Sequence, residues 1–339
     1  MTARWITDAV ELAALGPAWA ALCDDSRSSS PFERPEWLLP WVNVFGGDAR
    51  LRVLAIERVG ALVGVIPLVE TGPGDRDGPP HLGFLGTGVS DYHDAVLADD
   101  GPALQAEMWQ ALARRDWTTC ALDRLRPGSP LLRPIVAGAA GIGGDPIEQD
   151  VCPALAIPPG ARTIAEIVPA GYAGRLARAY RRAARLHRLT FRVPSGVAEA
   201  EELFAGLARL HTERWNLRGE PGVLAHEAVR RFHGLVIRAM WQTGLLRIFG
   251  LDVEGILAAV VYGFSVHGRM VFYLGAFDPS RASLSPGALL IAFAIERVLA
   301  EGGTVFDFLR GRESYKYRFG AVDRPCFART LRRLTAKRD

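Results

Sequence analysis

Polar and charged side chains gather directly after an apolar run near the end of the chain, in FDFLRGRESYKYRFG (306–320). The pattern of Phe306, Phe308 and Leu309 predicts a strand, and ligands of α/β proteins bind near the ends of such strands. The polar members of this segment are Asp307, Arg310, Arg312, Glu313, Tyr315, Lys316 and Arg318. Their density indicates a binding or catalytic site, and a solvated, salt-bridged turn is the equally weighted alternative.

The residue types of this segment suit proton transfer and the binding of an anion. Tyr315 is a candidate general acid, and Asp307 or Glu313 is a candidate general base. Arg310 and Lys316 could bind and neutralise a phosphate or carboxylate of a substrate.

A predicted strand, loop and helix lie upstream, in MVFYLGAFDPSRASLSPGALLIAFAIE (270–296). Ser285 is expected to cap the helix and Pro286 to occupy its first position. The backbone N–H groups expected to point out of the helix start are those of Gly287, Ala288 and Leu289. Together with the helix dipole they would suit a pyrophosphate, although an ordinary capped helix explains the same residues. A backbone N–H near the strand end at Phe277 could polarise a carbonyl.

Two further groups are weaker candidates. The segment SDYHD places Asp91 and His93 together, which suits a general base, although Ser90 and Asp91 could simply cap a turn. Trp215, which follows His211 on a predicted helix, could line an acceptor pocket, although a tryptophan more often packs in the core.

A stretch of 32 residues between Glu166 and Glu199 contains seven arginines and no acidic residue. Four of these arginines fall on one face of a predicted helix, and we call them the arginine stripe: Arg175, Arg178, Arg182 and Arg185. Such a stripe can bind phosphates, including those of an RNA backbone, although a solvated helix face is the simpler interpretation. The end of the chain is also basic, with Arg329, Arg332, Arg333, Lys337 and Arg338.

The elements that must position these residues predict two α/β domains, covering residues 1–160 and 161–339. In the second half we expect helices near 171–189, 197–216, 227–243 and 286–301, around a three-stranded meander over 245–276. Both halves show a helix, hairpin, strand, helix, strand order, which would suit a duplicated domain.

The composition fits a globular protein of 339 residues with a formal charge of +3. The four cysteines form no C-x-x-C pair, so the sequence predicts no metal site and a reduced, cytoplasmic setting. The longest uncharged apolar stretch, near 255–268, is too short for a membrane helix.

The spacing of SPGALL before FDFLRG-x-E-x-YK resembles the CelD-type acetyltransferase-like family, a branch of the GNAT superfamily. FERPEWLLPWVNVFG, GVIPLV, GVSDYHDAVL and LHTERWNLRG also fit the family pattern, so the resemblance runs from about Phe32 to Phe319. It implies tandem GNAT-like domains of mixed, mostly antiparallel sheets flanked by helices, similar to the FemABX aminoacyltransferases.

The resemblance implies an N-acyltransferase that moves an acyl group, typically acetyl, from a CoA thioester to an amine of a small molecule or biosynthetic intermediate. An alternative is a FemABX-like enzyme that uses aminoacyl-tRNA as donor, for which the arginine stripe would bind the RNA. A third interpretation is a CoA-binding module without catalysis.

Overall fold

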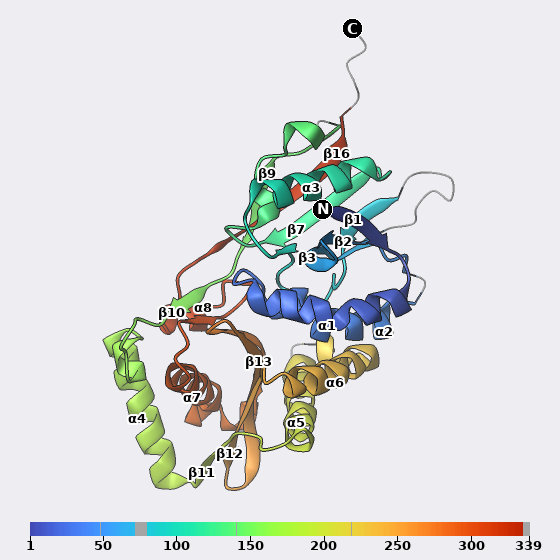
Figure 1. Ribbon diagram of the computed structural model, residues 1–339. Coiled ribbons are helices and arrows are strands. Elements are labelled where there is room, and N and C mark those ends of the chain that lie inside the picture. Colours follow the sequence, from blue (N-terminus) through green and yellow to red (C-terminus); the bar gives the residue numbers. More distant parts are fainter. Residues whose placement is uncertain (48, 72–79, 140, 218, 335–339) are drawn as a thin grey trace. The chain divides into compact units, whose positions relative to one another are not determined.

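The computed structural model describes residues 1–47, 49–71, 80–139, 141–217 and 219–334, and these form two compact units (Figure 1). Unit 1 combines residues 1–150 with the chain from Pro325 onward, and unit 2 spans Val151–Arg324. This division differs from a single cut at residue 160, because the last strand of the chain belongs to unit 1. No helix among the described residues is both long and apolar enough to span a membrane.

Unit 2 is built on one six-stranded sheet with the order β10-β15-β14-β13-β12-β11. Its strands are β10 (Ala154–Ala156), β11 (Leu189–Arg192), β12 (Leu246–Val253), β13 (Ile256–Val266), β14 (Arg269–Phe277) and β15 (Val305–Asp307). Its helices are α4 (Ala170–Leu186), α5 (Val197–Asn216), α6 (Glu227–Gln242), α7 (Pro286–Ala300) and α8 (Ser314–Arg318). Neighbouring strands are antiparallel except for the parallel pair β14 and β15.

The two faces of this sheet are covered by different helices, as alternation along β13 requires. Val261 points into an apolar core that contains Leu290 and Ile295 of α7. Tyr262, the next residue, lies on the other face, where its ring is 5.5 Å from that of Phe204 on α5. The meander β12–β14 and helix α7 therefore form the rigid frame on which loop residues of the unit are held.

Unit 1 contains a four-stranded sheet, β1-β2-β3-β6, and a five-stranded path, β4-β5-β7-β16-β8, with β9 paired to β16. The strands are β1 (Thr2–Ile6), β2 (Val53–Arg58), β3 (Ala61–Ile66), β4 (Leu68–Thr71), β5 (His81–Phe84), β6 (Val96–Leu97), β7 (Thr119–Leu125), β8 (Ile142–Gly143), β9 (Pro146–Val151) and β16 (Pro325–Arg333). The helices are α1 (Ala9–Asp25), α2 (Pro35–Phe45) and α3 (Pro102–Arg114).

Units 1 and 2 share an order of elements. From β1 to β7 and again from β11 to β15, a strand and two α-helices are followed by an antiparallel hairpin, further strand structure (β4, β5 and β6 in unit 1, β14 in unit 2), an α-helix and another strand. The strands that follow α3 and α7 are each parallel to an earlier strand, with β7 beside β5 and β15 beside β14. The sequence order that suggested a duplicated domain thus has a structural counterpart.

The basic end of the chain is a strand, which the sequence analysis did not predict. β16 pairs with β7, and two of its arginines lie over tryptophan rings. The guanidinium of Arg329 is 5.1 Å from the centre of Trp109, and that of Arg333 is 4.9 Å from Trp117. Arg329 also donates to the Leu131 and Arg133 carbonyls at 2.9 and 2.7 Å. These two cations therefore stabilise unit 1, while Lys337 and Arg338 lie outside the described residues.

Candidate functional site

The parallel strands β14 and β15 of unit 2 separate after a short paired stretch. Arg269, Met270 and Val271 pair with Val305–Asp307, and β14 then continues alone to Phe277. Its pairing with β13 shifts register where Tyr273 is the extra residue, which is a β-bulge that bends β14. Along the second half of β14, the edge on the β15 side therefore makes no pairing with β15.

A cavity of about 330 Å³, here called the α7 cavity, lies beside this edge. Its walls come from the end of β14, the start of α7 and the short helix α8, with additions from α4 and α5. Most lining groups are apolar, and the polar ones include Arg214, Ser285, Tyr315 and Arg318. The apolar wall residues include Phe272, Gly275, Phe277 and Phe319.

The start of α7 differs in one respect from the prediction. Ser285 occupies the predicted N-cap position, but it has left-handed backbone angles (φ 56°, ψ 43°) and its side chain makes no capping hydrogen bond. Pro286 does occupy the first helical position. The Leu289 N–H bonds to the Ser285 carbonyl at 3.1 Å, which leaves Gly287 and Ala288 as the N–H groups ahead of the first helical bond.

Gly287 lies against the wall of the cavity. A Cβ atom at this position would be 3.1 Å from Cδ1 of Phe277, which is tighter than an ordinary contact. The absence of a side chain therefore lets the end of β14 approach the first turn of α7, and both segments line the cavity.

A second cavity of about 500 Å³, the basic cavity, adjoins the first. The two share Tyr172, Ser285, Ala288 and Arg318, and the basic cavity adds Arg175 of α4. The guanidinium of Arg175 lies 5.2 Å from the centre of the Tyr172 ring. Two cations and the positive end of a helix thus meet at one place, an arrangement that attracts anions.

Comparison with known proteins identifies this arrangement. Residues 171–317 match the family described as acetyltransferase (GNAT) domain. Those residues are a GNAT domain. No curated protein matches the chain in sequence.

The fold of the whole chain is similar to solved structures of low sequence identity. The crystal structure of FemX aligns over 97% of both chains, with 12% identity and a TM-score of 0.66. The C-terminal domain (DUF2156) of a putative lysylphosphatidylglycerol synthetase from Agrobacterium fabrum aligns over 94% of this chain and 91% of its own length. Its identity is 14% and its TM-score 0.59. The predicted tandem GNAT fold is therefore confirmed, with an α/β architecture of mixed sheets and helices.

Tyr315 of the GNAT domain lies in the wall of the α7 cavity, on helix α8. Its ring meets that of Phe308 edge-on at 6.1 Å. Burial, with a smaller contribution from the negative charge of Glu313, holds the pKa of the Tyr315 phenol far above its usual value. A phenol is protonated at neutral pH even at its usual pKa, and burial strengthens that preference.

The two predicted carboxylate bases have different surroundings. Asp307 is fully buried, and its carboxylate pairs with Arg269 at 3.1 Å and accepts the Leu309 N–H at 2.9 Å. Both interactions of this carboxylate stabilise the end of β15. Glu313 is exposed and pairs with Lys316 at 2.9 Å, two residues before Tyr315.

The two predicted anion-binding cations do not line either cavity. Lys316 is only 2% exposed, and its ammonium donates to the Leu309, Arg310 and Gly311 carbonyls at 3.0, 2.7 and 3.0 Å. Its charge thus supports the loop that carries Tyr315. Arg310 is exposed outside the cavity walls. The neighbouring Arg318 lies in both walls instead, because it follows Tyr315 by one helical turn on α8.

Trp215 also lies outside the two cavity walls. Its ring lies 5.8 Å from that of His211 on the same helix, whereas Arg214, between them in sequence, lines the α7 cavity. This helix end was identified from the sequence, and of its residues Arg214 lies in the cavity wall, because side-chain direction depends on how the helix is rotated against the sheet.

Asp91 and His93 lie in unit 1, where the segment around them forms a network of its own. His93 is buried, its Nδ1 lies 3.0 Å from the carboxylate of Asp123, and its ring stacks on Phe84 at 5.0 Å. Asp94 accepts a hydrogen bond from Ser129 at 2.6 Å, and burial raises its pKa to about 7. The carboxylate partner of the histidine is thus Asp123 and not one of its sequence neighbours.

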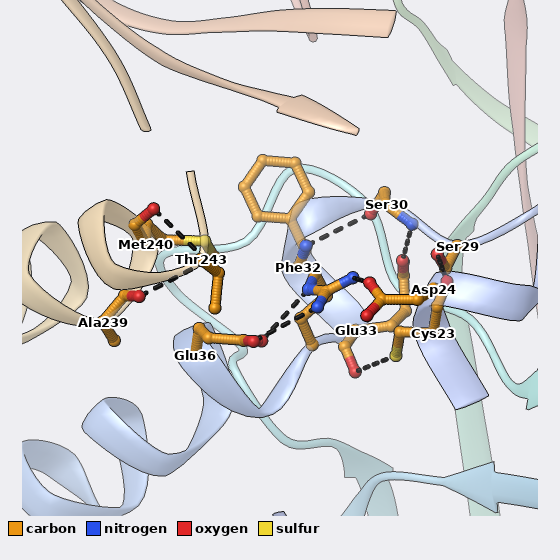
Figure 2. Close-up of polar contacts among 11 residues, drawn as sticks. Cys23, Asp24, Ser29, Ser30, Phe32, Glu33, Glu36, Ala239, Met240 and Thr243 are labelled. Atoms are coloured by element: carbon orange, nitrogen blue, oxygen red, sulfur yellow. Dashed lines mark hydrogen bonds and ion pairs between the residues drawn. The ribbon is translucent and has the colours of Figure 1, made fainter. Parts of the chain in front are cut away.

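Residues 30–36, at the start of the family-like segment, stabilise the turn before α2 in unit 1. Figure 2 shows the Ser30 N–H donating to Glu33, at 2.6 Å, which caps the turn before α2. Buried Arg34 pairs with Asp24 at 2.6 Å and with Glu36 at 3.0 Å. The described residues contain no group of three or more histidine, cysteine, aspartate or glutamate side chains able to hold a metal ion.

Proposed function

We propose that the protein is an N-acyltransferase that moves an acyl group from a CoA thioester to an amine. The observation that carries the proposal is the pair of adjoining cavities at the start of α7, one basic and one largely apolar. A CoA thioester has the same division, with a charged pyrophosphate at one end and an uncharged pantetheine arm at the other.

The chain has suitable partners for each part of this donor. The N–H groups of Gly287 and Ala288, with Arg175 and Arg318, would bind the pyrophosphate. Ser285, Pro286 and Leu289 would shape this helix start without donating a hydrogen bond to the pyrophosphate. The pantetheine arm would follow the edge of β14 past Phe277, so that the thioester carbonyl lies where backbone N–H groups near Gly275–Phe277 can polarise it.

The reaction would be a direct attack of the amine nitrogen on the thioester carbonyl carbon. A C–N bond forms, the C–S bond breaks, and the departing thiolate takes a proton from Tyr315. We propose Glu313 as the group that accepts the proton from the amine, because Glu313 is exposed, whereas Asp307 is fully buried against Arg269. The acceptor is a small molecule or a biosynthetic intermediate.

Calorimetry with acetyl-CoA and a transfer assay over an amine panel test this proposal. We expect wild type to bind acetyl-CoA, and the double variant Arg175→Gln/Arg318→Gln to bind it about 10- to 100-fold more weakly, because charge-assisted hydrogen bonds to phosphate are lost. Arg178→Gln, an exposed change on the same helix as Arg175, is the matched control and should leave affinity within about twofold. No binding of acetyl-CoA by wild type would overturn the proposal, and binding without any transfer would favour the non-catalytic module.

A second candidate, transfer from aminoacyl-tRNA, is favoured by the exposure of the arginine stripe on α4. Two of its members have contacts within the protein: Arg175 lies over Tyr172, and Arg182 donates to the Ser283 carbonyl. Arg178 and Arg185 would then carry most of the phosphate binding.

The tRNA donor makes a distinct prediction. Arg178→Gln/Arg185→Gln should weaken tRNA binding. The variant should also reduce the magnitude of the slope of log affinity against log salt concentration by about one to two, because each phosphate contact that is lost no longer releases counterions from the RNA. Filter binding at several salt concentrations measures the slope. Transfer that is abolished by ribonuclease and absent with acetyl-CoA would replace the first proposal by this one.

A further inference from the structure

The cations that border the two cavities of the GNAT domain divide into two groups. Arg318 lines both cavities and Arg175 lines the basic one, so this pair belongs to the phosphate end of the proposed donor site. Arg214 lines only the α7 cavity, together with Phe277 and Tyr315, which are likewise absent from the walls of the basic cavity. A third positive charge thus lies at the reacting end of the site.

Arg214 packs against an aromatic ring of the cavity wall. It lies in the last turn of α5, and its guanidinium carbon is 5.1 Å from the centre of the Phe277 ring. A guanidinium that stacks on an aromatic ring keeps its N–H groups in its own plane, where they form a fork that fits a planar carboxylate. Lysine would not reproduce this geometry.

The surroundings of Arg214 favour an anionic ligand over a neutral one. The described residues that line the α7 cavity include no aspartate or glutamate, and most of its surface is apolar. In such a wall a charge–charge attraction is screened less than in water. Arg214 also acts on the catalytic end of the cavity, because its positive charge lowers the pKa of the Tyr315 phenol against the larger effect of burial.

We propose that Arg214 binds a carboxylate of the substrate at the reacting end of the α7 cavity, and that this selects carboxylate-bearing substrates. The inference rests on the proposed function and adds the substrate class to it. The carboxylate has two possible sources, the acyl chain of a dicarboxylic acyl-CoA or the acceptor, as in an α-amino acid. Both place a carboxylate a few bonds from the reacting carbonyl or nitrogen.

Matched ligand pairs test the proposal by calorimetry, without requiring the natural acceptor. Succinyl-CoA is compared with butyryl-CoA, and a panel of α-amino acids with the corresponding decarboxylated amines, both with CoA-saturated protein and without CoA. We expect wild type to bind the carboxylated member of at least one pair about 10- to 100-fold more tightly, the range for hydrogen bonds to a charged group. Arg214→Gln should reduce that preference to within about threefold.

Arg209→Gln is the matched control, because Arg209 lies on the same helix, is exposed and pairs with Glu213 at 3.1 Å. It should retain the wild-type preference. A preference in the acyl-CoA pair identifies the acyl chain as the source, and one in the amino acid pairs identifies the acceptor. No preference in wild type, or a preference that survives Arg214→Gln, overturns the inference. Failure of all CoA ligands to bind overturns the proposed function, while the pairs measured without CoA still decide the role of Arg214.

Discussion

Replacing Tyr315 by phenylalanine should lower kcat for acyl transfer about 100-fold and leave the affinity for acetyl-CoA within about twofold. The hydroxyl is proposed to protonate the departing thiolate, and loss of a general acid costs at least about 100-fold in many enzymes. The ring itself is retained, so its edge-on contact with Phe308 and the cavity wall are preserved. Steady-state kinetics and calorimetry on the same preparation separate the two effects.

Tyr317→Phe is the control for this variant. Tyr317 lies on the same short helix, but it is exposed, its hydroxyl donates to Asp323 at 2.7 Å, and it does not line the α7 cavity. Its kcat should stay within about twofold of wild type. An unchanged kcat in Tyr315→Phe would remove this residue from the mechanism, whatever the outcome for CoA binding.

The second large effect concerns stability. Lys316→Met should lower the free energy of unfolding by about 2–4 kcal/mol, because the Leu309, Arg310 and Gly311 carbonyls lose their shared charged donor. Methionine keeps most of the apolar length of the side chain, so the loss reports on the ammonium group. Urea unfolding of the full chain measures it, and the same variant should weaken acetyl-CoA binding because the loop positions α8 and Arg318.

Arg312→Met provides the comparison for Lys316→Met. Arg312 is in the same loop, but its side chain is 67% exposed and pairs with Asp323 at 2.9 Å. Pairs of this kind contribute about 0–1 kcal/mol. A loss in Lys316→Met no larger than in Arg312→Met would show that the three carbonyls find water or other donors, and that the lysine is not what holds the loop.

Elements with strong local signals could be predicted from the sequence. Helix α7 begins at Pro286 as expected, because proline at the first helical position loses no hydrogen bond. The meander β12–β14 was predicted from apolar strands joined by glycine-containing turns. In each case the residues that decide the structure are neighbours in the chain.

The candidate site was predicted only in outline, because its details depend on partners distant in sequence. Serine is a residue type that often caps helices, but Ser285 follows the 3-10 turn Pro279–Leu284 and has a left-handed backbone conformation. Lys316 and Arg318 look equivalent in sequence, yet one turns inward to backbone carbonyls and the other toward the cavities. Arg214 lies in LHTERWNLRG, a segment that fits the family pattern. Its position in the cavity wall, however, depends on how α5 packs on β14.

The position of β16 affects how unit 1 folds while the chain is being synthesised. Residues up to Asp150 are synthesised before unit 2, but the strand that pairs with β7 begins only at Pro325. Unit 1 therefore has to wait, with one backbone edge of β7 uncovered, until the whole of unit 2 has been synthesised. During that interval the exposed edge is a site at which chaperones or other nascent chains can pair. A chain released at residue 324 would thus contain all of unit 2 but lack the strand that covers β7.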